Sequence, residues 1–585
     1  MRWRIPKRWA KGARRPAGRN PGEDRRNRRC QARPLPISVL MPLALYLLWC
    51  WTGLLRGAPL DTFLFFYSRV YLYNLAGILI FQFGDDSTIN WFEVVLMALG
   101  SIEAALIIQT RISGGAPWLG GYLGNSLHSG ILLPCAFVIA FTRIRLNDPQ
   151  RLRSISLLAA ILATALAMFF LHSRTGLILM AVLLVFLYPR KMMWIVAAAA
   201  VFAIAWTILR KGGILLDLRI DSLGLKGTAA RLGIWATDVD AIMARPITGW
   251  GLGNFEMAYL QFQHPGGYGL RYGQSTMFAH NGLLQTAAET GLPGAILLLW
   301  GFATLLKNVI PLVRKERSLF SIVIVFLMTS MVNYSLFLPF NGLIFTTAVA
   351  LLAAKSTAVH RPHSTIDLSK FRLVPTFMIG LLSAFLMSYG FSEALQKNGK
   401  LSVAAKVCPI RSEAWYALAL QNMSNLKAAI PFLERALITN NQNSFYWQRT
   451  ALVLIHIQPT EESKINLCFK QAQSLAPFHA PFYVQEGFYR LGTLQLEMAK
   501  KLFKKAVSLE PATTLPHYGL ALVYQRAGQQ HAARVELDLV RSLESKKQEL
   551  ERDPVHGSSY QELFNSSYAR FLFGVDERQS QGKTN

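Results

Sequence analysis

Long apolar runs alternate with short polar connections from residue 37 to residue 390. A helix that crosses a bilayer needs about 20 mostly apolar residues, and eleven runs reach or approach this length. We predict spanning helices over 37–55, 62–83, 91–110, 126–142, 153–171, 174–189, 192–209, 281–306, 318–336, 339–354 and 372–390. The runs 174–189 and 339–354 are short, so tilted, re-entrant or merged helices stay open there. The pattern predicts an all-α, polytopic membrane helix bundle.

Beyond residue 395 the apolar runs end, and apolar and polar residues alternate at helical spacing. A weak repeat is visible, because Ala436, Ala472 and Ala506 recur 36 and 34 residues apart. This period resembles tetratricopeptide repeats, which are helix pairs that bury their apolar faces by stacking on one another. We predict a TPR-like α-solenoid over 395–550, with an irregular helical bundle as the alternative, and a polar tail over 551–585.

Composition agrees with a membrane location. Hydrophobic residues make up 52% of the chain and charged residues 16%, against about 25% charged in globular proteins, and the mean hydropathy is +0.28. The net charge of +28 points to nucleic acid at first sight, but thirteen Lys and Arg residues precede residue 34. Many others lie in short connections, as in multi-pass membrane proteins with cytoplasmic positive charge. We therefore expect residues 1–36 to form a disordered, basic cytoplasmic arm, and no nucleic acid partner.

The same charges orient the helices. With eleven helices, the connections 143–153, 190–191, 307–317 and 355–372, all rich in Lys and Arg, fall on the side of the basic arm. This count places a membrane domain over 37–390 with the N-terminus in the cytoplasm. It puts the large loop 210–280 and everything after residue 390 on the outer, periplasmic side.

Three ionisable side chains lie inside apolar runs, namely Arg69, Glu93 and Glu103. Such groups normally face the interior of a bundle or a water-filled cavity. For Arg69 and Glu93 a position near a helix end, with the charge reaching toward water, explains the sequence. Glu103 lies deeper, and the sequence assigns it no role.

The outer loop and its flanks hold the candidate chemistry. Arg174 opens an apolar run at its outer end, where a fixed bidentate donor meets a lipid phosphate. Arg231 begins an amphipathic helix that Pro246 ends. His280 precedes the next span, and its imidazole is a candidate general base near neutral pH. Two arginines and one histidine beside the membrane suit chemistry on a lipid-linked phosphate.

Around these residues the sequence resembles the bacterial O-antigen ligase and polymerase superfamily, membrane glycosyltransferases that act on undecaprenyl-diphosphate-linked glycans. The matching features are Ser173-Arg174-Thr175-Gly176, then Arg231, Trp235, Pro246, Gly249-Trp250-Gly251-Leu252-Gly253 and Phe255, then Ala279-His280-Asn281, Leu284-Gln285, Glu289 and Gly291-Leu292-Pro293-Gly294. The segment 122–133, with Asn125, is similar to an Asn-rich helix start of the family. The resemblance covers roughly residues 115–355, and relatives usually have one more span than we predict.

The resemblance implies an inverting transfer that is independent of metal and needs no cofactor. Arg174 and Arg231 would hold the diphosphate of the donor and stabilise its charge as it leaves, and His280 would orient or deprotonate the acceptor hydroxyl. The residues it suggests for substrate binding are Asn281, Gln285, Glu289, Trp235, Gly251, Gly253 and Asn125.

The implied partners follow from this reaction. The donor is an undecaprenyl-diphosphate-linked glycan, and the acceptor is a lipid, a glycan or a protein. Transfer takes place at the outer face of the bacterial cytoplasmic (inner) membrane, among membrane lipids. An envelope protein is a candidate partner of the TPR-like repeats.

Several alternatives stay open. The acceptor decides between an O-antigen ligase, a polysaccharide polymerase and a protein O-oligosaccharyltransferase. A non-enzymatic polysaccharide transporter or scaffold is the alternative from another class, and it would leave the His280 and Arg231 motifs without a purpose. Asp238-Val239-Asp240 is similar to the DxD of metal-dependent glycosyltransferases, but residues i and i+2 of a helix point away from each other. The five cysteines form no CxxC pair. We therefore predict no metal site.

Overall fold

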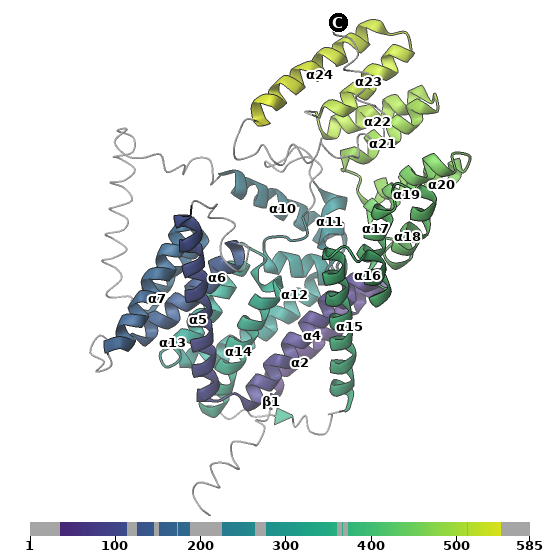
Figure 1. The fold of residues 1–585 in the computed structure, drawn as a ribbon. Helices are drawn as coiled ribbons and strands as arrows, with labels where there is room; N and C mark the ends of the chain where they lie inside the picture. Colours follow the sequence, from purple (N-terminus) through teal and green to yellow (C-terminus); the bar gives the residue numbers. More distant parts are fainter. Residues whose placement is uncertain are drawn as a thin grey trace, which may run out of the picture.

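The computed structural model describes residues 35–113, 126–144, 151–171, 174–187, 225–263, 276–359, 365–366, 373–511 and 513–551. Within these residues the fold is all-α apart from two strands of two residues each. The long helices form a bundle. The shorter helices of residues 401–551 curve over one end of it and are called the helical arch (Figure 1). The basic arm up to residue 34, the predicted span 192–209 and the tail beyond residue 551 lie outside the described residues.

The membrane part follows the predicted apolar runs. Its helices are α2 (Ile37–Cys50), α3 (Thr52–Leu55), α4 (Leu60–Phe83), α5 (Asp86–Ile112), α6 (Ser126–Arg143), α7 (Arg151–Phe170), α8 (Arg174–Leu187), α12 (Gly282–Val309), α13 (Arg317–Ser330), α14 (Pro339–Val359) and α15 (Leu373–Lys397). Short 3-10 turns, η2 (Ile310–Leu312) and η3 (Ser335–Phe337), follow α12 and α13. Ten of the eleven predicted runs therefore coincide with helices.

Six helical stretches among the described residues are long and apolar enough to cross a membrane. They are Ile37–Leu55, Leu60–Phe83, Asp86–Ile112, Gly282–Leu312, Pro339–Thr357 and Phe377–Lys397. Three shorter apolar helices accompany them, Ser129–Arg143, Ser154–Phe170 and Arg317–Ser330. The chain is a membrane protein with multiple spanning helices, and the total of eleven spans stays a prediction.

A strand pair fixes which connections share an end of the bundle. Strand β1 (Leu35–Pro36) pairs antiparallel with β2 (Thr365–Ile366), so the start of α2 and the connection before α15 lie together. The helical arch lies at the opposite end (Figure 1). This arrangement agrees with the sides that the charge pattern assigns to these segments. Which end faces the cytoplasm stays a prediction from charge.

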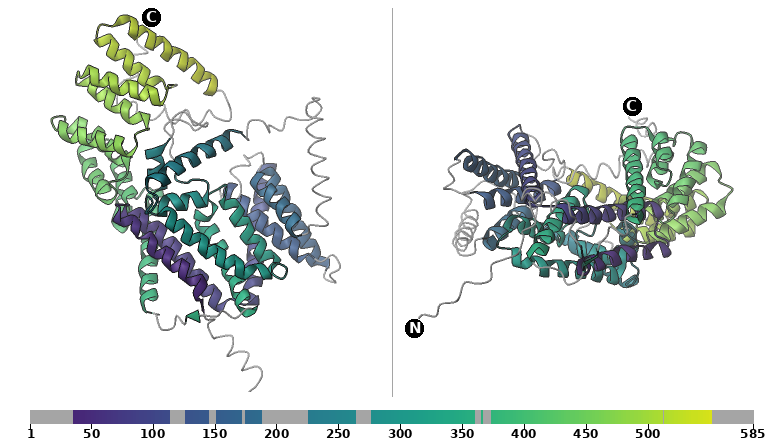
Figure 2. Two further views of the ribbon diagram at one scale, coloured as in Figure 1. Left: turned by 180° about the vertical axis from the view of Figure 1, so that it is seen from behind. Right: turned by 90° about the horizontal axis from the view of Figure 1, so that it is seen from below.

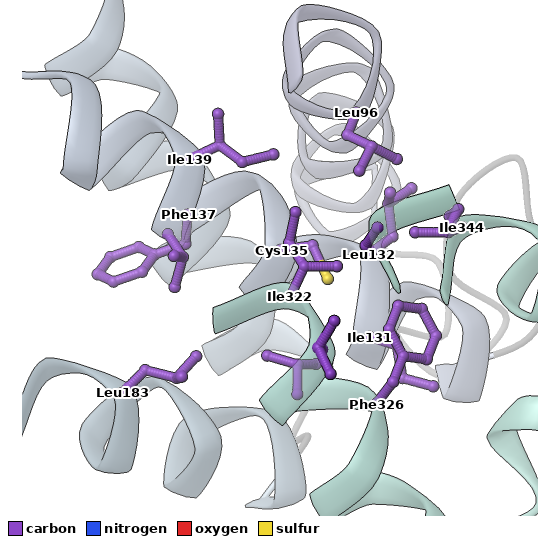
Figure 3. Packing of buried hydrophobic residues seen from close by; sticks show 14 of the residues in the cluster. Leu96, Ile131, Leu132, Cys135, Phe137, Ile139, Leu183, Ile322, Phe326 and Ile344 are labelled. Carbon is purple, nitrogen blue, oxygen red and sulfur yellow. The ribbon is translucent and has the colours of Figure 1, made fainter. Parts of the chain in front are cut away.

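The core of the bundle surrounds α6. All of residues 131–140 are buried, because α5, α7, α8 and α13 enclose this helix, and Leu96, Cys135, Ile139, Leu183 and Phe326 pack together there (Figure 3). Gly100 of α5 allows the close approach, since a Cβ at this position would lie 2.3 Å from the Cβ of Ala136. Small residues at crossings are the usual way in which membrane helices pack closely.

The two glutamates inside the apolar runs have hydrogen-bond partners, and the arginine stacks on an aromatic ring. Glu93 does not reach to water as the sequence suggested, because it accepts a hydrogen bond of 2.7 Å from Nε of Arg143 and another from Ser318. Glu103 is 2% exposed and accepts a hydrogen bond of 2.6 Å from Ser129. The guanidinium of Arg69 lies 3.8 Å from the centre of the Phe65 ring. The two glutamates therefore join α5 to α6 and α13.

The C-terminal region consists of stacked helix pairs. After α16 (Leu401–Val407) come α17 (Ser412–Gln421) with α18 (Leu426–Thr439), α19 (Ser444–Ile457) with α20 (Glu462–Leu475), α21 (Ala480–Gly492) with α22 (Leu496–Leu509), and α23 (Thr514–Arg526) with α24 (Gln530–Glu551). The repeating alanines Ala436, Ala472 and Ala506 are fully buried, each on the second helix of a pair. The prediction of a helical repeat region is confirmed.

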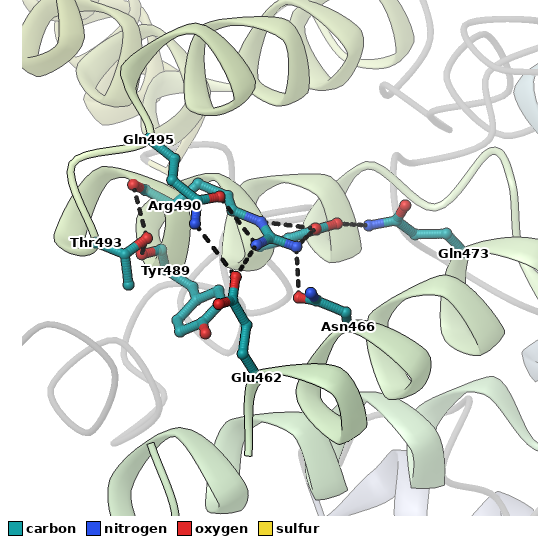
Figure 4. A network of polar contacts seen from close by, with 8 residues as sticks. Glu462, Asn466, Gln473, Tyr489, Arg490, Thr493 and Gln495 are labelled. Carbon is teal, nitrogen blue, oxygen red and sulfur yellow. Dashed lines mark hydrogen bonds and ion pairs between the residues drawn. The ribbon is translucent and has the colours of Figure 1, made fainter. Parts of the chain in front are cut away.

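A buried arginine joins neighbouring pairs of this region. Arg490 of α21 contacts Glu486 at 2.8 Å and Asn466 of α20 at 2.6 Å, and it donates to Gln495 ahead of α22 at 3.0 Å (Figure 4). Glu486 also accepts a hydrogen bond of 2.6 Å from Gln473. The buried charge is therefore fully partnered, as the low dielectric of a protein interior requires.

The repeats are seated on the end of the bundle opposite the strand pair, which we call the outer end after its predicted side. They lie on the side of α4 and α15 and away from α5 and α7 (Figure 2). Asp61, in the first turn of α4, accepts hydrogen bonds from the backbone N–H of Ser412 at 3.2 Å and from its hydroxyl at 2.5 Å. Leu260, in the long outer connection, packs with Ala472 and Phe482 of the repeats. A polar contact and an apolar contact therefore fix the repeats to the membrane part.

We expect Asp61→Ala to loosen this junction. Asp61 is 4% exposed and Ser412 is 1% exposed, so the substitution leaves buried donors unpaired, at a cost of about 1–3 kcal/mol. Hydrogen exchange of the first amides of α17 in the detergent-solubilised protein should become roughly tenfold faster or more. Asp538→Ala is the control, since it removes only an exposed ion pair with Arg541. Equal protection of α17 in both variants would contradict the role of Asp61.

Candidate active site

The candidate residues come from three elements that pack together at the outer end. Helix α10 (Leu225–Ala244) and helix α11 (Phe255–Phe262) lie in the long outer connection and rest on α12 (Figure 1). Their shared core contains Ile234 and Ile242 of α10, Phe255 of α11, and Ala287 and Ala288 of α12. Small alanines on α12 leave room for the two helices of the loop.

Helix α10 differs from the predicted helix in two ways. It begins at Leu225, ahead of Arg231, and its apolar residues divide between two faces. Ile242 is 7% exposed and packs on the core, whereas Val239 and Met243 are 50% and 70% exposed. The helix ends at Ala244, ahead of Pro246, as expected.

Helix α12 is interrupted at Gly291, whose backbone angles are φ 73° and ψ 174°. Backbone groups freed at this point find partners in the chain. The N–H of Leu292 donates to the carbonyl of Pro246 at 2.8 Å, and the indole N–H of Trp49 donates to the carbonyl of Thr290 at 2.8 Å. An interrupted membrane helix is tolerated only when such groups are paired inside the protein.

The interruption corrects the sequence analysis, which treated 281–306 as one continuous helix. The signal was present in Gly291 and Pro293, a pair that disfavours helix at this point. A transporter would be expected to carry paired broken helices. Of the fully described membrane helices α2, α4, α5, α12 and α13, α12 alone has an internal non-helical residue.

The glycine turn 249–253 packs against this interruption. Gly249, Gly251 and Gly253 have positive φ values of 64°, 94° and 81°, which glycine adopts without steric cost. A Cβ at Gly249 would lie 2.5 Å from the backbone of α12, one at Gly251 2.4 Å from the Cβ of Ala58, and one at Gly253 2.2 Å from the Phe66 ring. The close approaches in the structure are thus between parts of this chain. Substrate contact by Gly251 and Gly253 stays a prediction.

His280 is held in place through Ala279, the residue that precedes it. The N–H of Ala279 donates to Oε1 of Gln285 at 3.2 Å, and its carbonyl accepts from the indole N–H of Trp235 at 3.0 Å. His280 itself has a positive φ of 53°. Positive φ is uncommon outside glycine and tends to occur at functional sites. Three of the predicted residues therefore meet here, and two of them position the third.

Asn281 caps α12. Its side-chain oxygen accepts hydrogen bonds from the N–H groups of Leu283 at 3.0 Å and Leu284 at 3.1 Å, and its amide donates to the carbonyl of Met331 at 3.1 Å. This is the usual function of asparagine at a helix N-terminus. Direct binding of substrate by Asn281 stays a prediction.

The imidazole of His280 is half-buried and faces aromatic and polar neighbours. It packs edge-on against Tyr334 with ring centres 5.1 Å apart, and its Nδ1 has no hydrogen-bond partner among the described residues. Burial and the positive charge of Arg231 lower the pKa of His280 to about 4, and Asn333 opposes this shift. The imidazole is therefore neutral at pH 7 and free to accept a proton.

Arg231 lies one helical turn before Trp235, on the same face of α10. It is half-buried, and burial lowers its pKa while leaving it protonated. The described residues include no ion-pair partner for it. A positive charge next to a neutral imidazole forms a site for an anion beside a proton acceptor.

Glu289 and Gln285 connect this site to the helix interruption. Glu289 is 1% exposed and accepts a hydrogen bond of 2.9 Å from Nε2 of Gln285, whose other side-chain atom holds Ala279. The second carboxylate oxygen of Glu289 has no partner among the described residues. The structure gives both side chains a part in positioning His280, and their contact with substrate stays a prediction.

Two predicted residues cannot be placed. Arg174 is the first residue of α8, but its side chain lies outside the described residues, and so does Asn125. Asp238 is fully buried, which raises its pKa to about 8, whereas Asp240 is exposed. The two aspartates therefore point in different directions, as their spacing predicted.

Trp49, Asn333 and Tyr334 also neighbour the site, and the sequence did not predict this. Their positions in apolar runs or connections gave no signal, since the contacts depend on how distant helices pack.

A large cavity lies elsewhere. It measures about 1000 Å³, has a mainly apolar lining and lies between α2, α4, α12 and α14, toward the end of the bundle that carries β1. The candidate residues of the outer end do not line it. The cavity is therefore separate from the site around Arg231 and His280.

The fold and the site together define an all-α, multi-spanning membrane protein with a basic, histidine-containing site beside the membrane. A family model described as O-antigen ligase matches residues 158–299. This range contains Arg174, Arg231 and His280. The chain therefore carries an O-antigen ligase domain, the domain of a glycosyltransferase family.

The repeat region is similar to solved structures of MamA. One, "Crystal structure of MamA protein", is 16% identical with a TM-score of 0.26 and covers 28% of this chain and 94% of that chain. Another, "MamA 41-end from Desulfovibrio magneticus RS-1", is 20% identical with a TM-score of 0.25 and covers 28% of this chain and 96% of that chain. No curated relative matches the chain.

We expect Gly249→Ala to destabilise the site. Alanine with positive φ costs about 1–2 kcal/mol, and its Cβ would also collide with the backbone of α12. The control is Gly399→Ala, where φ is 74° and a Cβ would meet nothing within 4 Å. The apparent melting temperature of the solubilised protein should fall clearly further for Gly249→Ala. Equal falls would show that the approach to α12 has little energetic weight.

Proposed function

We propose that the protein transfers a glycan from an undecaprenyl-diphosphate-linked donor to an acceptor hydroxyl at the outer face of the cytoplasmic membrane. The observation that carries this proposal is the pairing of Arg231 with His280. A hydrogen bond from Trp235 to the residue before His280 holds them together, within the range that matches the O-antigen ligase family. The site thus offers a fixed positive charge and a neutral imidazole.

Each residue has a part in the proposed displacement. The acceptor oxygen forms a bond to the anomeric carbon while the bond to the diphosphate oxygen breaks and its electron pair leaves with the diphosphate. Arg231, together with Arg174, stabilises the charge that develops on this leaving group. The proton of the acceptor hydroxyl passes to the imidazole of His280.

The low pKa of His280 fits this order of events. In the free protein, burial and Arg231 keep the imidazole neutral. A bound diphosphate brings negative charge to the same place, and an opposite charge favours the protonated imidazole. His280 therefore becomes a stronger base when the donor is present, so donor binding prepares the site for the acceptor.

The acceptor class is a separate question. The repeats contact α11 through Leu260, which packs with Ala472 and Phe482, and α11 lies next to the site. This proximity supports a function of the repeats in binding an acceptor or an envelope protein. It favours a polymerase or a protein O-oligosaccharyltransferase slightly over a ligase that acts on a lipid acceptor.

We expect His280→Ala and Arg231→Gln to lose transfer by at least about a hundredfold, the usual scale for removing a general base or a charge-stabilising donor. The measurement is transfer from purified undecaprenyl-diphosphate-linked glycan by the solubilised protein, with EDTA present and products weighed by mass spectrometry. His531→Ala, an exposed histidine of α24, is the control and should transfer normally. The product mass identifies the acceptor class. Full transfer by all variants would refute the site.

We also expect Arg231→Gln to raise the pKa of His280 from about 4 toward 6.5, because removing a neighbouring positive charge makes protonation easier. Diethyl pyrocarbonate reacts with histidine only when the imidazole is neutral. The rate of modification at His280 can therefore be followed by mass spectrometry from pH 4 to pH 8. In the wild type the rate should fall only near the acid end. In the variant the midpoint should move to higher pH, and Arg435→Gln, in the repeats, should leave it in place. Unchanged midpoints in all three proteins would argue against the contact.

A further inference from the structure

A small polar cleft lies where the membrane part meets the repeats. It is lined by Arg56, in the turn between α3 and α4, by Arg245, just after α10, by Asn254 and Gln261 of the α11 region, and by Gln442 of the repeats. None of these residues takes part in the reaction proposed above. The cleft therefore needs its own explanation.

The cleft holds two positive charges. The guanidinium of Arg245 lies 3.8 Å from the centre of the Trp250 ring, and the Trp250 indole N–H donates to the carbonyl of Ala241 at 2.9 Å, which fixes this stack. Burial and the nearby charge of Arg56 lower the pKa of Arg245. The described residues contain no ion-pair partner for either arginine. Two cations kept close together without an acid favour binding of an anion.

Asn254 gives independent support. Its side chain is 3% exposed, yet neither its oxygen nor its nitrogen has a hydrogen-bond partner among the described residues. Buried polar groups are paired in the great majority of cases. Asn254 also occupies the N-cap position of α11 without capping it, so its amide is not used by the helix. An unpaired amide and two arginines line the same cleft.

This cleft is separate from the site of transfer. Arg231 and Arg245 lie fourteen residues apart along α10 and its end, which corresponds to about 21 Å at the rise of an α-helix. One diphosphate cannot bridge that distance, but an extended oligosaccharide can. The side-chain amides of Asn254, Gln261 and Gln442 both donate and accept hydrogen bonds, as sugar hydroxyls require.

We propose that this cleft binds a carboxylate or phosphate carried by the glycan chain, several sugars away from its reacting end. The proposal rests on the proposed function for the identity of the ligand, because it makes the substrate an acidic glycan. The headgroup of an anionic phospholipid offers similar chemistry. The three amides and the wall contributed by the repeats favour the saccharide.

Binding without turnover tests the proposal. The probes are a hyaluronan hexasaccharide, which carries carboxylates, and chitohexaose, which is neutral and of equal length, titrated calorimetrically into the full chain in nanodiscs. We expect the hyaluronan fragment to bind the wild type and to bind the double variant Arg56→Gln, Arg245→Gln at least about tenfold more weakly. Chitohexaose should bind all proteins weakly. Arg435→Gln, an exposed arginine of α18, is the matched control.

Three outcomes decide the matter. Selective loss of hyaluronan binding in the double variant, with an unchanged melting temperature, supports the proposal. Hyaluronan binding that is absent from the wild type or equal in all proteins overturns it. A loss of co-purified phosphatidylglycerol in native mass spectra of the double variant, without any change in hyaluronan binding, assigns the cleft to lipid and also overturns it. His280→Ala should bind like the wild type, so failure of transfer and failure of this cleft are distinguishable.

Discussion

The geometry of the outer end depends on the interruption of one membrane helix. At Gly291 the hydrogen-bond ladder of α12 stops, and the freed backbone groups need partners inside the protein. Pro246 and Trp49 supply them. The chain after α10 must therefore lie against α12, and α10 follows it. Because Trp235 of α10 holds the peptide before His280, a requirement of the backbone in lipid fixes the position of the candidate base.

The arginines at this end share one property, which is that the described residues contain no ion-pair partner for them. Arg231 keeps a positive charge beside a neutral His280, and Arg56 and Arg245 repeat the situation at the far end of α10. Elsewhere in the described chain, buried charges such as Glu93 and Arg490 are paired. These arginines at the outer end favour binding of a negatively charged ligand, whereas Glu93 of the bundle and Arg490 of the repeats already have partners within the chain.

The sequence predicted the parts of the fold that depend on local pattern. Apolar runs located ten helices, and the spacing of Ala436, Ala472 and Ala506 located the stacked pairs. Hydropathy is insensitive to backbone angles, so the interruption at Gly291 was missed although its glycine and proline were noticed. The pairing of Glu93 was missed for a different reason, since contacts between α5, α6 and α13 depend on packing over long sequence distances. The resemblance to a family predicted His280 and Arg231 as site residues. It did not predict that Gln285 and Trp235 hold the histidine in place.

The contact between Asp61 and Ser412 has a consequence for how the molecule is made. These residues are 351 positions apart, so the first helices enter the membrane long before the partner of Asp61 has been synthesised. Oδ1 of Asp61 accepts hydrogen bonds from the neighbouring Thr62, but its Oδ2 lacks the Ser412 donors until the last membrane helix has crossed and the first repeat has folded beside it. Folding of the C-terminal half thus completes the hydrogen bonds of Asp61. A chain truncated before Ser412 keeps the carboxylate of Asp61 exposed, whereas the intact protein buries it.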